Sequence, residues 1–495
     1  MSQINVSDLS FYYDGSYDPI FEHVSFQIDT DWKLGFVGRN GRGKTTFLKL
    51  LMGEYEYRGS ISASVSFDYF PFPVKEISRN TIDIIEEVQP DYELWRVMKE
   101  MTLLNVDADV LYRPFETLSH GERTKILLSV LFSRDNHFLL IDEPTNHLDM
   151  ETREMVMDYL NHKKGFILVS HDRWFLDGCT DHTLSINKTD IEIVRGNFSV
   201  WWENKKRRDA FELAENERLK KEVGRLKKAA RQSGKWADDV EASKIGRKSF
   251  QYERNIDTRA YVGEKSRRMQ MRRKNLEHRQ NKAIEEKEQL LKNIESEEEL
   301  KIMTLPHHKN RLVTLEDVGI NYGGRQVVEH LGMTVDQGER IVLNGRNGCG
   351  KSSVIRLLLG ENVPHTGKVE LASGMVISYI SQDTGWLKGD LRSFARDHQL
   401  AESLFLTILR KLDFAREQFD KPIEDYSEGQ KKKVLIAKSL SEQANLYIWD
   451  EPLNFIDLFS RMQIEELILR YKPTLLMVEH DRSFVENVAT HVVRL

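Results

Sequence analysis

The sequence contains the same short segments twice, in the same order, and this repetition limits the chain to a duplicated fold. GRNGRGKTT at 38–46 returns as GRNGCGKSS at 345–353, offset by 307 residues. LSHGE at 118–122 returns as YSEGQ at 426–430, and LLIDEPTNHLD at 139–149 returns as YIWDEPLNFID at 447–457, both offset by 308. SHDRWF at 170–175 returns as EHDRSF at 479–484, offset by 309. These nearly constant offsets predict two homologous domains, 1–198 and 312–495, joined by 199–311, which has no counterpart in either copy.

Each copy alternates short apolar runs with longer helical patterns. The runs include KLGFVG, FLLIDE and GFILVSH in the first copy, and RIVLNG, LYIWDE and TLLMVEH in the second. Segments such as TTFLKLLMG and RTKILLSVLF, which lie between the runs, have the period of a helix. Apolar runs bounded by Gly and Asp, with helices between them, are typical of βαβ units on a buried parallel sheet. We therefore predict the α/β class for both copies.

The connecting segment differs from both copies in its charge. Residues 221–280 contain 18 Lys+Arg and 8 Asp+Glu, a net charge of +10, whereas the whole chain carries −6. Residues 201–232 and 265–300 are rich in helix-forming residues and lack Pro, so we expect two helices with a turn around 233–263. A helix of 32 residues, the length of 201–232, would span about 48 Å. We predict a long basic α-helical hairpin, with the aromatic residues Trp236, Phe250, Tyr252 and Tyr261 near its turn.

Composition excludes several classes of protein. The only two cysteines, Cys179 and Cys349, are far apart, which excludes a disulfide framework and a cysteine-based zinc site. No run of 18 apolar residues occurs, and the N-terminus lacks the pattern of a signal peptide. We expect a cytoplasmic protein in which any membrane role would need a separate subunit.

Both copies contain the GxxxxGK[ST] pattern of a phosphate-binding loop, placed after an apolar strand and before a helix. The glycines let backbone N–H groups point at phosphates, the lysine reaches the β and γ oxygens, and the hydroxyl residue binds Mg²⁺. The first copy supplies Gly38, Asn40, Gly41, Gly43, Lys44, Thr45 and Thr46. The second copy supplies Gly345, Asn347, Gly348, Gly350, Lys351, Ser352 and Ser353.

Acidic residues and a histidine follow two further strands in each copy. Asp142 and Asp450 end apolar runs and are candidate ligands of the Mg²⁺ shell. Each is followed by a glutamate that can polarise a water molecule against the γ-phosphate, so we predict catalytic roles for Glu143 and Glu451. The histidines after the next strands suit a contact to the γ-phosphate, and these are His171 and His480.

This combination of motifs resembles the ATP-binding cassette family, over about 380 residues that include both copies. The resemblance implies two tandem P-loop cassette domains in which the S-x-G-[EQ] helix of one copy closes over ATP held by the other. Ser427 and Gly429 would then cap ATP on Lys44, and Ser119 and Gly121 would cap ATP on Lys351. It also implies adenine stacking on Tyr13 and Tyr322, and coupling of the two sites through Asp149 and Asp457.

The sequence departs from the family pattern at two places. The first Gly of the signature Gly-Gly pair is replaced by His120 in one copy and by Glu428 in the other. The second copy has Gln382 for the loop glutamine that helps to order Mg²⁺, whereas the first has Phe70, Pro71 and Phe72 there. We therefore predict that the two sites hydrolyse ATP unequally.

Two cassettes joined by a long charged hairpin resemble the ABC-F branch, whose members act on ribosomes. The Walker glycine to signature serine distances of 81 and 82 residues leave no room for the additional arm of several housekeeping factors. The chain is therefore most similar to ribosome-protection proteins that confer resistance to lincosamides, pleuromutilins and streptogramin A. The implied partner is the 70S ribosome, at the 23S rRNA and the exit-site tRNA region, with no membrane and no DNA, bound by a monomer whose cassettes pair intramolecularly.

The alternatives are a housekeeping translation or ribosome-assembly factor, the ATPase subunit of a transporter, and a DNA-repair or chromosome ATPase. A transporter subunit would leave the basic hairpin without a role. A DNA-repair ATPase would be expected to contain much longer coiled coils or zinc fingers, and the sequence has neither.

Overall fold

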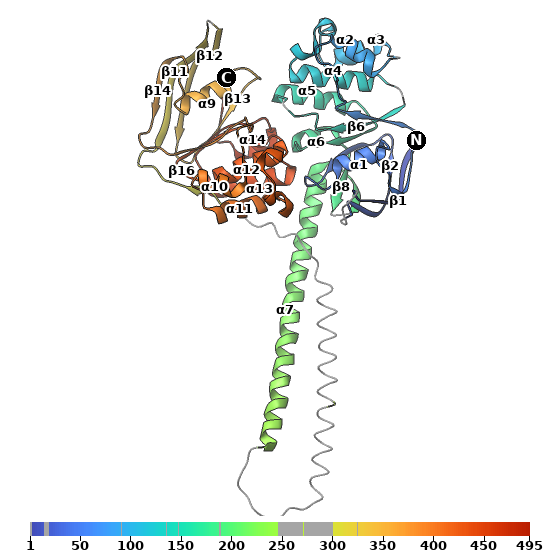
Figure 1. Ribbon diagram of the computed structural model, residues 1–495, viewed down its shortest axis with the longest axis vertical. Coiled ribbons are helices and arrows are strands. Elements are labelled where there is room, and N and C mark those ends of the chain that lie inside the picture. Colours follow the sequence, from blue (N-terminus) through green and yellow to red (C-terminus); the bar gives the residue numbers. More distant parts are fainter. Residues whose placement is uncertain are drawn as a thin grey trace, which may run out of the picture. The chain divides into compact units, whose positions relative to one another are not determined.

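The computed structural model describes residues 2–13, 19–90, 92–134, 136–146, 148–187, 190–245, 271, 300–323 and 325–495. The chain divides into two compact units, one comprising Met1–Trp201 with Glu298–Leu495 and the other Trp202–Glu297. The first unit contains both copies of the duplicated domain, which Figure 1 colours from blue to green and from yellow to red.

The first copy contains two sheets. Its strands are β1(Gln3–Phe11), β2(Phe21–Asp29), β3(Lys33–Val37), β4(Arg58–Ser62), β5(Ser66–Phe70), β6(His137–Asp142), β7(Phe166–Val169), β8(His182–Asn187) and β9(Asp190–Arg195). The sheet β2-β1-β4 is antiparallel, whereas β5-β6-β7-β3-β8-β9 is parallel except for its last pair. The helices are α1(Lys44–Leu51), α2(Thr81–Val88), α3(Leu94–Leu103), α4(His120–Phe132), α5(Met150–Asn161) and α6(Arg173–Cys179).

The second copy repeats this arrangement. Its antiparallel sheet is β12-β11-β14 and its parallel sheet is β15-β17-β18-β13-β19, so the α/β prediction is confirmed. The strands are β10(Met303–Thr304), β11(Arg311–Tyr322), β12(Arg325–Asp336), β13(Arg340–Asn344), β14(His365–Leu371), β15(Ile377–Ile380), β16(Gln443–Ala444), β17(Leu446–Asp450), β18(Leu475–Val478) and β19(His491–Arg494). The helices are α9(Lys351–Leu358), α10(Leu391–Asp397), α11(Glu402–Lys411), α12(Glu428–Ser441), α13(Leu458–Tyr471) and α14(Arg482–Val488).

The core of the first copy fixes the helix that follows the phosphate loop. Phe47 of α1 is fully buried, and the centre of its ring lies 6.0 Å from the ring centre of Phe21 and 5.7 Å from that of Phe26, both on β2. The same ring lies 5.6 Å from Phe36 of β3. One side chain thus contacts both sheets, so the start of α1 has a defined position at the edge of the parallel sheet.

The helix α7(Phe198–Ile245) has 48 residues, so it continues past the turn predicted to begin near 233. A helix of that length spans about 72 Å rather than about 48 Å. Its residue Val223 is buried and Leu219 is half-buried. The predicted second arm at 265–300 and most of the predicted turn lie outside the described residues.

The boundaries of the units differ from the sequence-based boundaries 198/199 and 311/312. Residues before 312 pack on the second copy because β10 pairs in parallel with β16, and Leu305 N–H donates to the Ala444 carbonyl at 2.8 Å. Leu300 and Ile302 are buried in the core of the same copy.

Candidate nucleotide-binding sites

The predicted site residues of the first copy meet where three parallel strands end. The strands β3, β6 and β7 are neighbours, and the register pairs Asp142 with Val169. The phosphate loop, Asp142 with Glu143, and His171 therefore all follow the carboxyl ends of adjacent strands, where α/β sheets bind ligands. They line a cavity of about 770 Å³ whose predicted residues are Tyr13, Asn40, Gly41, Gly43, Lys44, Thr45, Thr46, Asp142, Glu143 and His171.

The phosphate loop of the first copy is closed around its lysine. Lys44 begins α1 and is only 8% exposed, and its Nζ donates to the Gly38 carbonyl at 2.7 Å and to Asn40 Oδ1 at 3.3 Å. Gly43 has φ of 90°, a left-handed conformation in which a side chain would be strained. Burial lowers the pKa of Lys44, and the carboxylate of Asp457 opposes that shift. The loop presents a helix N-terminus and a buried cation to the cavity, the arrangement that phosphate binding requires.

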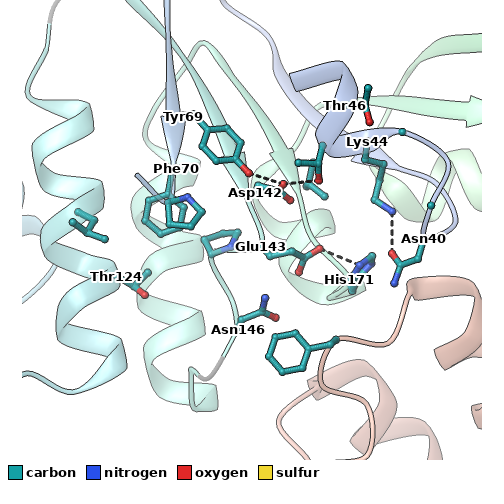
Figure 2. Close-up of a pocket in the computed structure, with 18 of the residues that line it drawn as sticks. Asn40, Lys44, Thr46, Tyr69, Phe70, Thr124, Asp142, Glu143, Asn146 and His171 are labelled. Atoms are coloured by element: carbon teal, nitrogen blue, oxygen red, sulfur yellow. Dashed lines mark hydrogen bonds and ion pairs between the residues drawn. The ribbon is translucent and has the colours of Figure 1, made fainter. Parts of the chain in front are cut away.

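Oxygen donors suitable for Mg²⁺ lie beside this loop. Asp142 Oδ2 accepts from Thr45 Oγ1 at 3.0 Å and from the Tyr69 hydroxyl at 2.9 Å, and Figure 2 shows the contact between Tyr69 and Asp142. A carboxylate and an adjacent hydroxyl are hard oxygen donors of the kind that Mg²⁺ prefers, so these residues fit the ion. Burial raises the pKa of Asp142. Tyr69 was missed by the sequence argument, and its place next to the end of β5 was the only signal available.

The catalytic candidates of the first copy face one another. Glu143 Oε1 lies 3.2 Å from His171 Nε2, and Figure 2 shows both side chains directed into the cavity. The pKa of Glu143 is raised to about 8, mainly by burial and secondly by the neighbouring Asp142 carboxylate. Burial and the Lys44 cation lower the pKa of His171, which keeps its imidazole neutral. Glu143 has φ of 51°, a strained conformation for a non-glycine residue, and its N–H donates to the Val169 carbonyl at 2.9 Å.

The second copy builds a related cavity of about 480 Å³. Lys351 Nζ donates to the Gly345 carbonyl at 2.7 Å and to the Arg346 carbonyl at 3.0 Å, which repeats the closed phosphate loop. The predicted residues that line this cavity are Tyr322, Asn347, Gly348, Gly350, Lys351, Ser352, Ser353, Gln382, Glu451 and His480.

The acidic residues of the second copy have different neighbours from those of the first. Gln382 Nε2 donates to Glu451 Oε2 at 2.9 Å, and His480 Nε2 lies 3.8 Å from Glu451 Oε1. Burial works to raise the pKa of Glu451, but the hydrogen bond and charge of His480, with Lys432 and Gln382, lower it overall. The pKa of Asp450 is raised to about 6, mainly by burial and secondly by the charge of Glu451. Glu451 also has a left-handed φ, 48°.

The predicted adenine contacts lie at the rims of the two cavities. The Tyr13 hydroxyl is 2.7 Å from Thr46 Oγ1, and the Tyr322 hydroxyl donates to Ser353 Oγ at 3.3 Å. Both rings are about two-fifths exposed, at 42% for Tyr13 and 41% for Tyr322. Each tyrosine therefore presents an accessible ring beside its own phosphate loop.

The signature serines cap helices. Ser119 Oγ accepts from Glu122 N–H at 3.2 Å at the start of α4, and Ser427 Oγ accepts from Gln430 N–H at 3.4 Å at the start of α12. The residue after Ser119, His120, lines the cavity around Lys351. The four predicted capping residues do not line the opposite cavities: neither Ser119 nor Gly121 lines the cavity around Lys351, and neither Ser427 nor Gly429 lines the cavity around Lys44.

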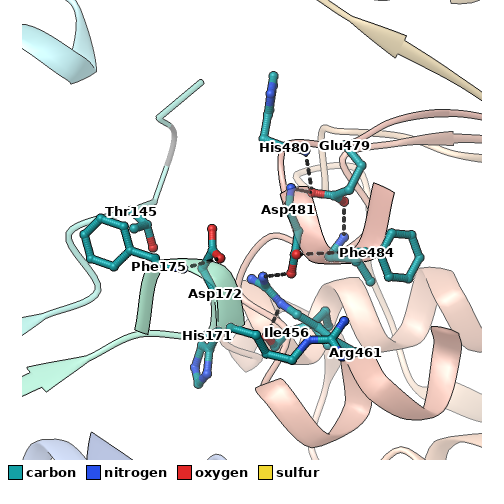
Figure 3. A network of polar contacts seen from close by, with 12 residues as sticks. Thr145, His171, Asp172, Phe175, Ile456, Arg461, Glu479, His480, Asp481 and Phe484 are labelled. Carbon is teal, nitrogen blue, oxygen red and sulfur yellow. Dashed lines mark hydrogen bonds and ion pairs between the residues drawn. The ribbon is translucent and has the colours of Figure 1, made fainter. Parts of the chain in front are cut away.

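Buried ion pairs lie where the two cassettes meet. Arg153 Nη1 donates to Asp172 Oδ2 at 2.9 Å and to the His480 carbonyl of the other cassette at 3.2 Å. The equivalent pair of the second cassette, Arg461 Nη1 with Asp481 Oδ2 at 3.2 Å, appears in Figure 3 near His480 and Asp172. The segments that carry His171 and His480 are thus each held by an arginine at the inter-cassette contact.

The two predicted coupling aspartates are held differently. Asp457 Oδ2 lies 2.8 Å from Lys433 Nζ, and both side chains are almost fully buried. Asp149 is half-buried and caps α5 by accepting from Thr152 N–H at 3.0 Å. Burial works to raise the pKa of Asp149, but hydrogen bonds from Thr152 and then from the Asn347 backbone, in the other phosphate loop, lower it overall.

Comparisons with known proteins agree with this geometry. The family described as "ABC transporter" matches residues 21–146 and 328–454, which together make up half of the chain. The chain therefore belongs to the ABC transporter family and is an ATPase.

Within that family the chain resembles the ABC-F branch, and its relatives include proteins of translation. It is 27% identical over 473 residues to the ribosome protection protein VmlR of Bacillus subtilis. The aligned region covers 94% of this chain and 82% of that relative. The energy-dependent translational throttle protein EttA of Haemophilus influenzae is 24% identical over 96% of this chain and 88% of its own length.

Solved structures share the fold. The structure of an RNase-L inhibitor matches with a TM-score of 0.63 and 18% identity, over 99% of this chain and 87% of that chain. Among the described helices, none is long and apolar enough to cross a membrane.

Proposed function

We propose that the chain is an ATP-dependent ribosome-binding protein that protects the peptidyl-transferase centre from antibiotics, with ATP hydrolysis driving its release. The observation that carries this proposal is the similarity to VmlR, a ribosome protection protein, across 94% of the chain, linker included. The 48-residue α7 supports it, because a helix spanning about 72 Å is the long helical element that the ABC-F resemblance implies for the linker.

The site residues have the following proposed roles. Lys44 and Lys351 hold the phosphates of ATP, and Tyr13 and Tyr322 stack on the adenines. Mg²⁺, which supplies charge neutralisation at the phosphates, would be held by Thr45, Asp142, Ser352, Asp450 and Gln382. Glu143 and Glu451 accept a proton from the attacking water, and His171 and His480 donate an N–H to the γ-phosphate.

The basic linker is the proposed ribosome contact. Residues 221–280 carry a net +10, and each phosphate that a Lys or Arg neutralises releases counterions, so binding should weaken steeply with salt. We propose that the linker reaches 23S rRNA from the exit-site tRNA region, with aromatic residues stacking on bases. Trp236 lies on α7, whereas Phe250, Tyr252 and Tyr261 lie outside the described residues.

The first experiment traps the ATP-bound form. Glu143→Gln with Glu451→Gln should lower turnover by about 10²-fold or more while ATP affinity is kept, because only proton transfer is removed. The trapped chain should then co-sediment with 70S ribosomes. If turnover in the double variant equals that of the unmodified chain, the assigned role of these glutamates is wrong.

The second experiment separates protection from a housekeeping role, which the similarity to EttA supports as the alternative. Cells that express the chain, or a form lacking residues 246–263, are tested for susceptibility to lincosamides and pleuromutilins. We expect the deletion to abolish protection while ATP-trapped ribosome binding persists. A chain that binds ribosomes but never protects cells would favour the housekeeping function.

A further inference from the structure

The helix α3 exposes large apolar side chains to solvent. The exposed fractions are 36% for Leu94, 62% for Trp95 and 40% for Met98. Successive residues of a helix are rotated by about 100°, so these three side chains lie within about 100° of one another around the helix. We name these three residues the α3 face. A single exposed apolar residue is ordinary, but several on one helix face are typical of a surface that a partner covers.

The opposite side of α3 packs into the first copy, so the α3 face has a fixed direction. Val97 and Met101 are almost fully buried. Glu100 is also buried, and it accepts a hydrogen bond from the Tyr159 hydroxyl at 2.6 Å and forms an ion pair with Lys163. Turning the α3 face inward would therefore expose apolar side chains and break a buried hydrogen bond and an ion pair.

The second copy shows that the fold does not need these exposed apolar residues. The offset of 308 residues aligns α3 with α11. The residues after the two helices agree with this alignment, because Leu104 and Leu412 are both fully buried. Asn105 and Asp413, the next residues, both have a left-handed φ. The second copy has Glu402 for Leu94, Ser403 for Trp95, Lys411 for Leu103 and Asp420 for Tyr112, while Met98 keeps an apolar counterpart, Leu406. The exposed apolar residues of the first copy therefore need an explanation other than folding.

The segment that contains the α3 face is acidic. Residues 76–117 contain ten Asp+Glu and four Lys+Arg, a net charge of −6. The aligned residues 384–425 contain eight and seven, a net charge of −1. The exposed carboxylates of the first segment include Glu86, Glu87, Glu93, Asp107, Asp109 and Glu116. These charges repel phosphates and attract Lys and Arg, so the α3 face suits a basic polypeptide and not a nucleic acid.

We propose that the α3 face binds a lysine- and arginine-rich polypeptide whose apolar side chains pack against Trp95 and its neighbours. The source of this polypeptide rests on the proposed function: it is a protein of the ribosome, because a protein bound to rRNA carries the positive charge that complements the acidic segment. The basic linker and the α3 face then bind different components of the ribosome, namely RNA and protein.

The first test uses the full chain and defined probes, without ribosomes. A short fluorescent peptide of alternating Lys and Leu is titrated, and its anisotropy gives the dissociation constant. Leu94→Ser with Trp95→Ser removes apolar contacts without changing the charge. We expect binding to weaken roughly tenfold or more, as for an aromatic residue at the centre of an interface. Equal dissociation constants for this variant and the unmodified chain, or equally tight binding of a peptide of alternating Glu and Leu, would overturn the proposal.

Matched changes control for the fold and for charge. Glu402→Gln with Ser403→Ala alters the aligned positions of α11 and should leave the dissociation constant unchanged. Glu93→Gln, beside Leu94, should weaken binding about threefold and reduce its dependence on salt, because one attracting charge is removed. ATP hydrolysis should be the same in all of these variants, since none of the changed residues lines a nucleotide cavity.

The second test identifies the partner on purified 70S ribosomes. A photoreactive benzophenone amino acid replaces Trp95 in the chain that also carries Glu143→Gln and Glu451→Gln, and mass spectrometry maps the adduct. We expect the adduct on a Lys- and Arg-rich segment of a ribosomal protein, and none when the photoreactive residue replaces Ser403. An adduct with rRNA or with a second copy of the chain, or no adduct although the chain co-sediments with ribosomes, would overturn the assignment. Failure to co-sediment would instead refute the proposed function, and the peptide titration would then decide the inference by itself.

Discussion

Replacing Arg153 with Ala should destabilise the first cassette in a manner that depends on pH. Arg153 is 5% exposed, and its partner Asp172 is 1% exposed. The guanidinium also donates through Nε to the Leu148 carbonyl at 3.0 Å and through Nη1 to the His480 carbonyl. The variant therefore leaves a buried carboxylate without its cation and two carbonyls without one donor each.

The magnitude follows from the cost of keeping Asp172 neutral. An unperturbed Asp has a pKa near 3.9, so protonating it costs about 4 kcal/mol at pH 7 and about 1.5 kcal/mol at pH 5. These values are upper bounds, because burial and Asp481 already raise the pKa of Asp172 while Arg153 is present. The lost carbonyl contacts add about 1–2 kcal/mol at either pH.

The sign of the pH effect is fixed by proton uptake. In the Arg153→Ala chain the folded state keeps a proton on Asp172 that the unfolded state releases, so the free energy of unfolding falls as pH rises. The loss relative to the unmodified chain should therefore be larger at pH 7 than at pH 5, by up to about 2.5 kcal/mol.

Urea unfolding of the full chain at both pH values measures this loss as a shift in the midpoint of the first transition. Adding Asp172→Asn to Arg153→Ala should abolish the pH dependence, because the buried carboxyl is gone. Arg207→Ala, which removes an exposed partner of Glu203 on α7, should cost less than about 0.5 kcal/mol. A loss that is equal at pH 5 and pH 7 would refute the reasoning.

Two further predictions concern backbone strain and the inter-cassette contacts. The free energy of unfolding of Glu143→Gly, measured in urea, should exceed that of Glu143→Ala by roughly 1 kcal/mol. The reason is that φ at this position is 51°, which strains alanine but not glycine. Arg173 contacts Glu465 across the cassettes with both side chains mostly buried, whereas Arg346 pairs with Glu151 at 2.8 Å with both side chains exposed. Double-mutant cycles should give a coupling energy below about 1 kcal/mol for the exposed pair and a larger one for the buried pair; equal couplings would contradict this.

Much of the fold could be predicted because the duplicated motifs fix what lies between them. A phosphate loop must follow a strand and begin a helix, and an apolar run that ends in Asp-Glu must be another strand of the same sheet. The meeting of Lys44, Asp142 and His171 follows from those two rules and from the parallel direction of the strands. The same rules hold for the second copy, which is why Lys351, Glu451 and His480 also meet.

Contacts between residues distant in the sequence could not be predicted in the same way. The hydroxyl of Tyr69 reaches Asp142 because β5 and β6 are neighbours, and strand order is not encoded in a local motif. The contact of Arg153 with the His480 carbonyl depends on how the two cassettes pack. Gln382 was expected near Mg²⁺, and the structure adds that its amide donates to Glu451, which only coordinates reveal.

The length of α7 shows how a local signal can mislead. Ser233 and Gly234 suggested a turn, but an isolated Gly inside a helix costs only about 1 kcal/mol relative to Ala. The residues on both sides, which include Ala229, Ala230 and Ala237, favour the helix strongly enough to offset that cost. Trp236 consequently lies within α7 and not in a turn. Replacement of Trp236 therefore tests the role of the helix α7 in ribosome binding and protection. Deletion of 246–263 tests the role of the residues that follow the helix. The effects of the two changes on ribosome binding and on protection should be independent of each other.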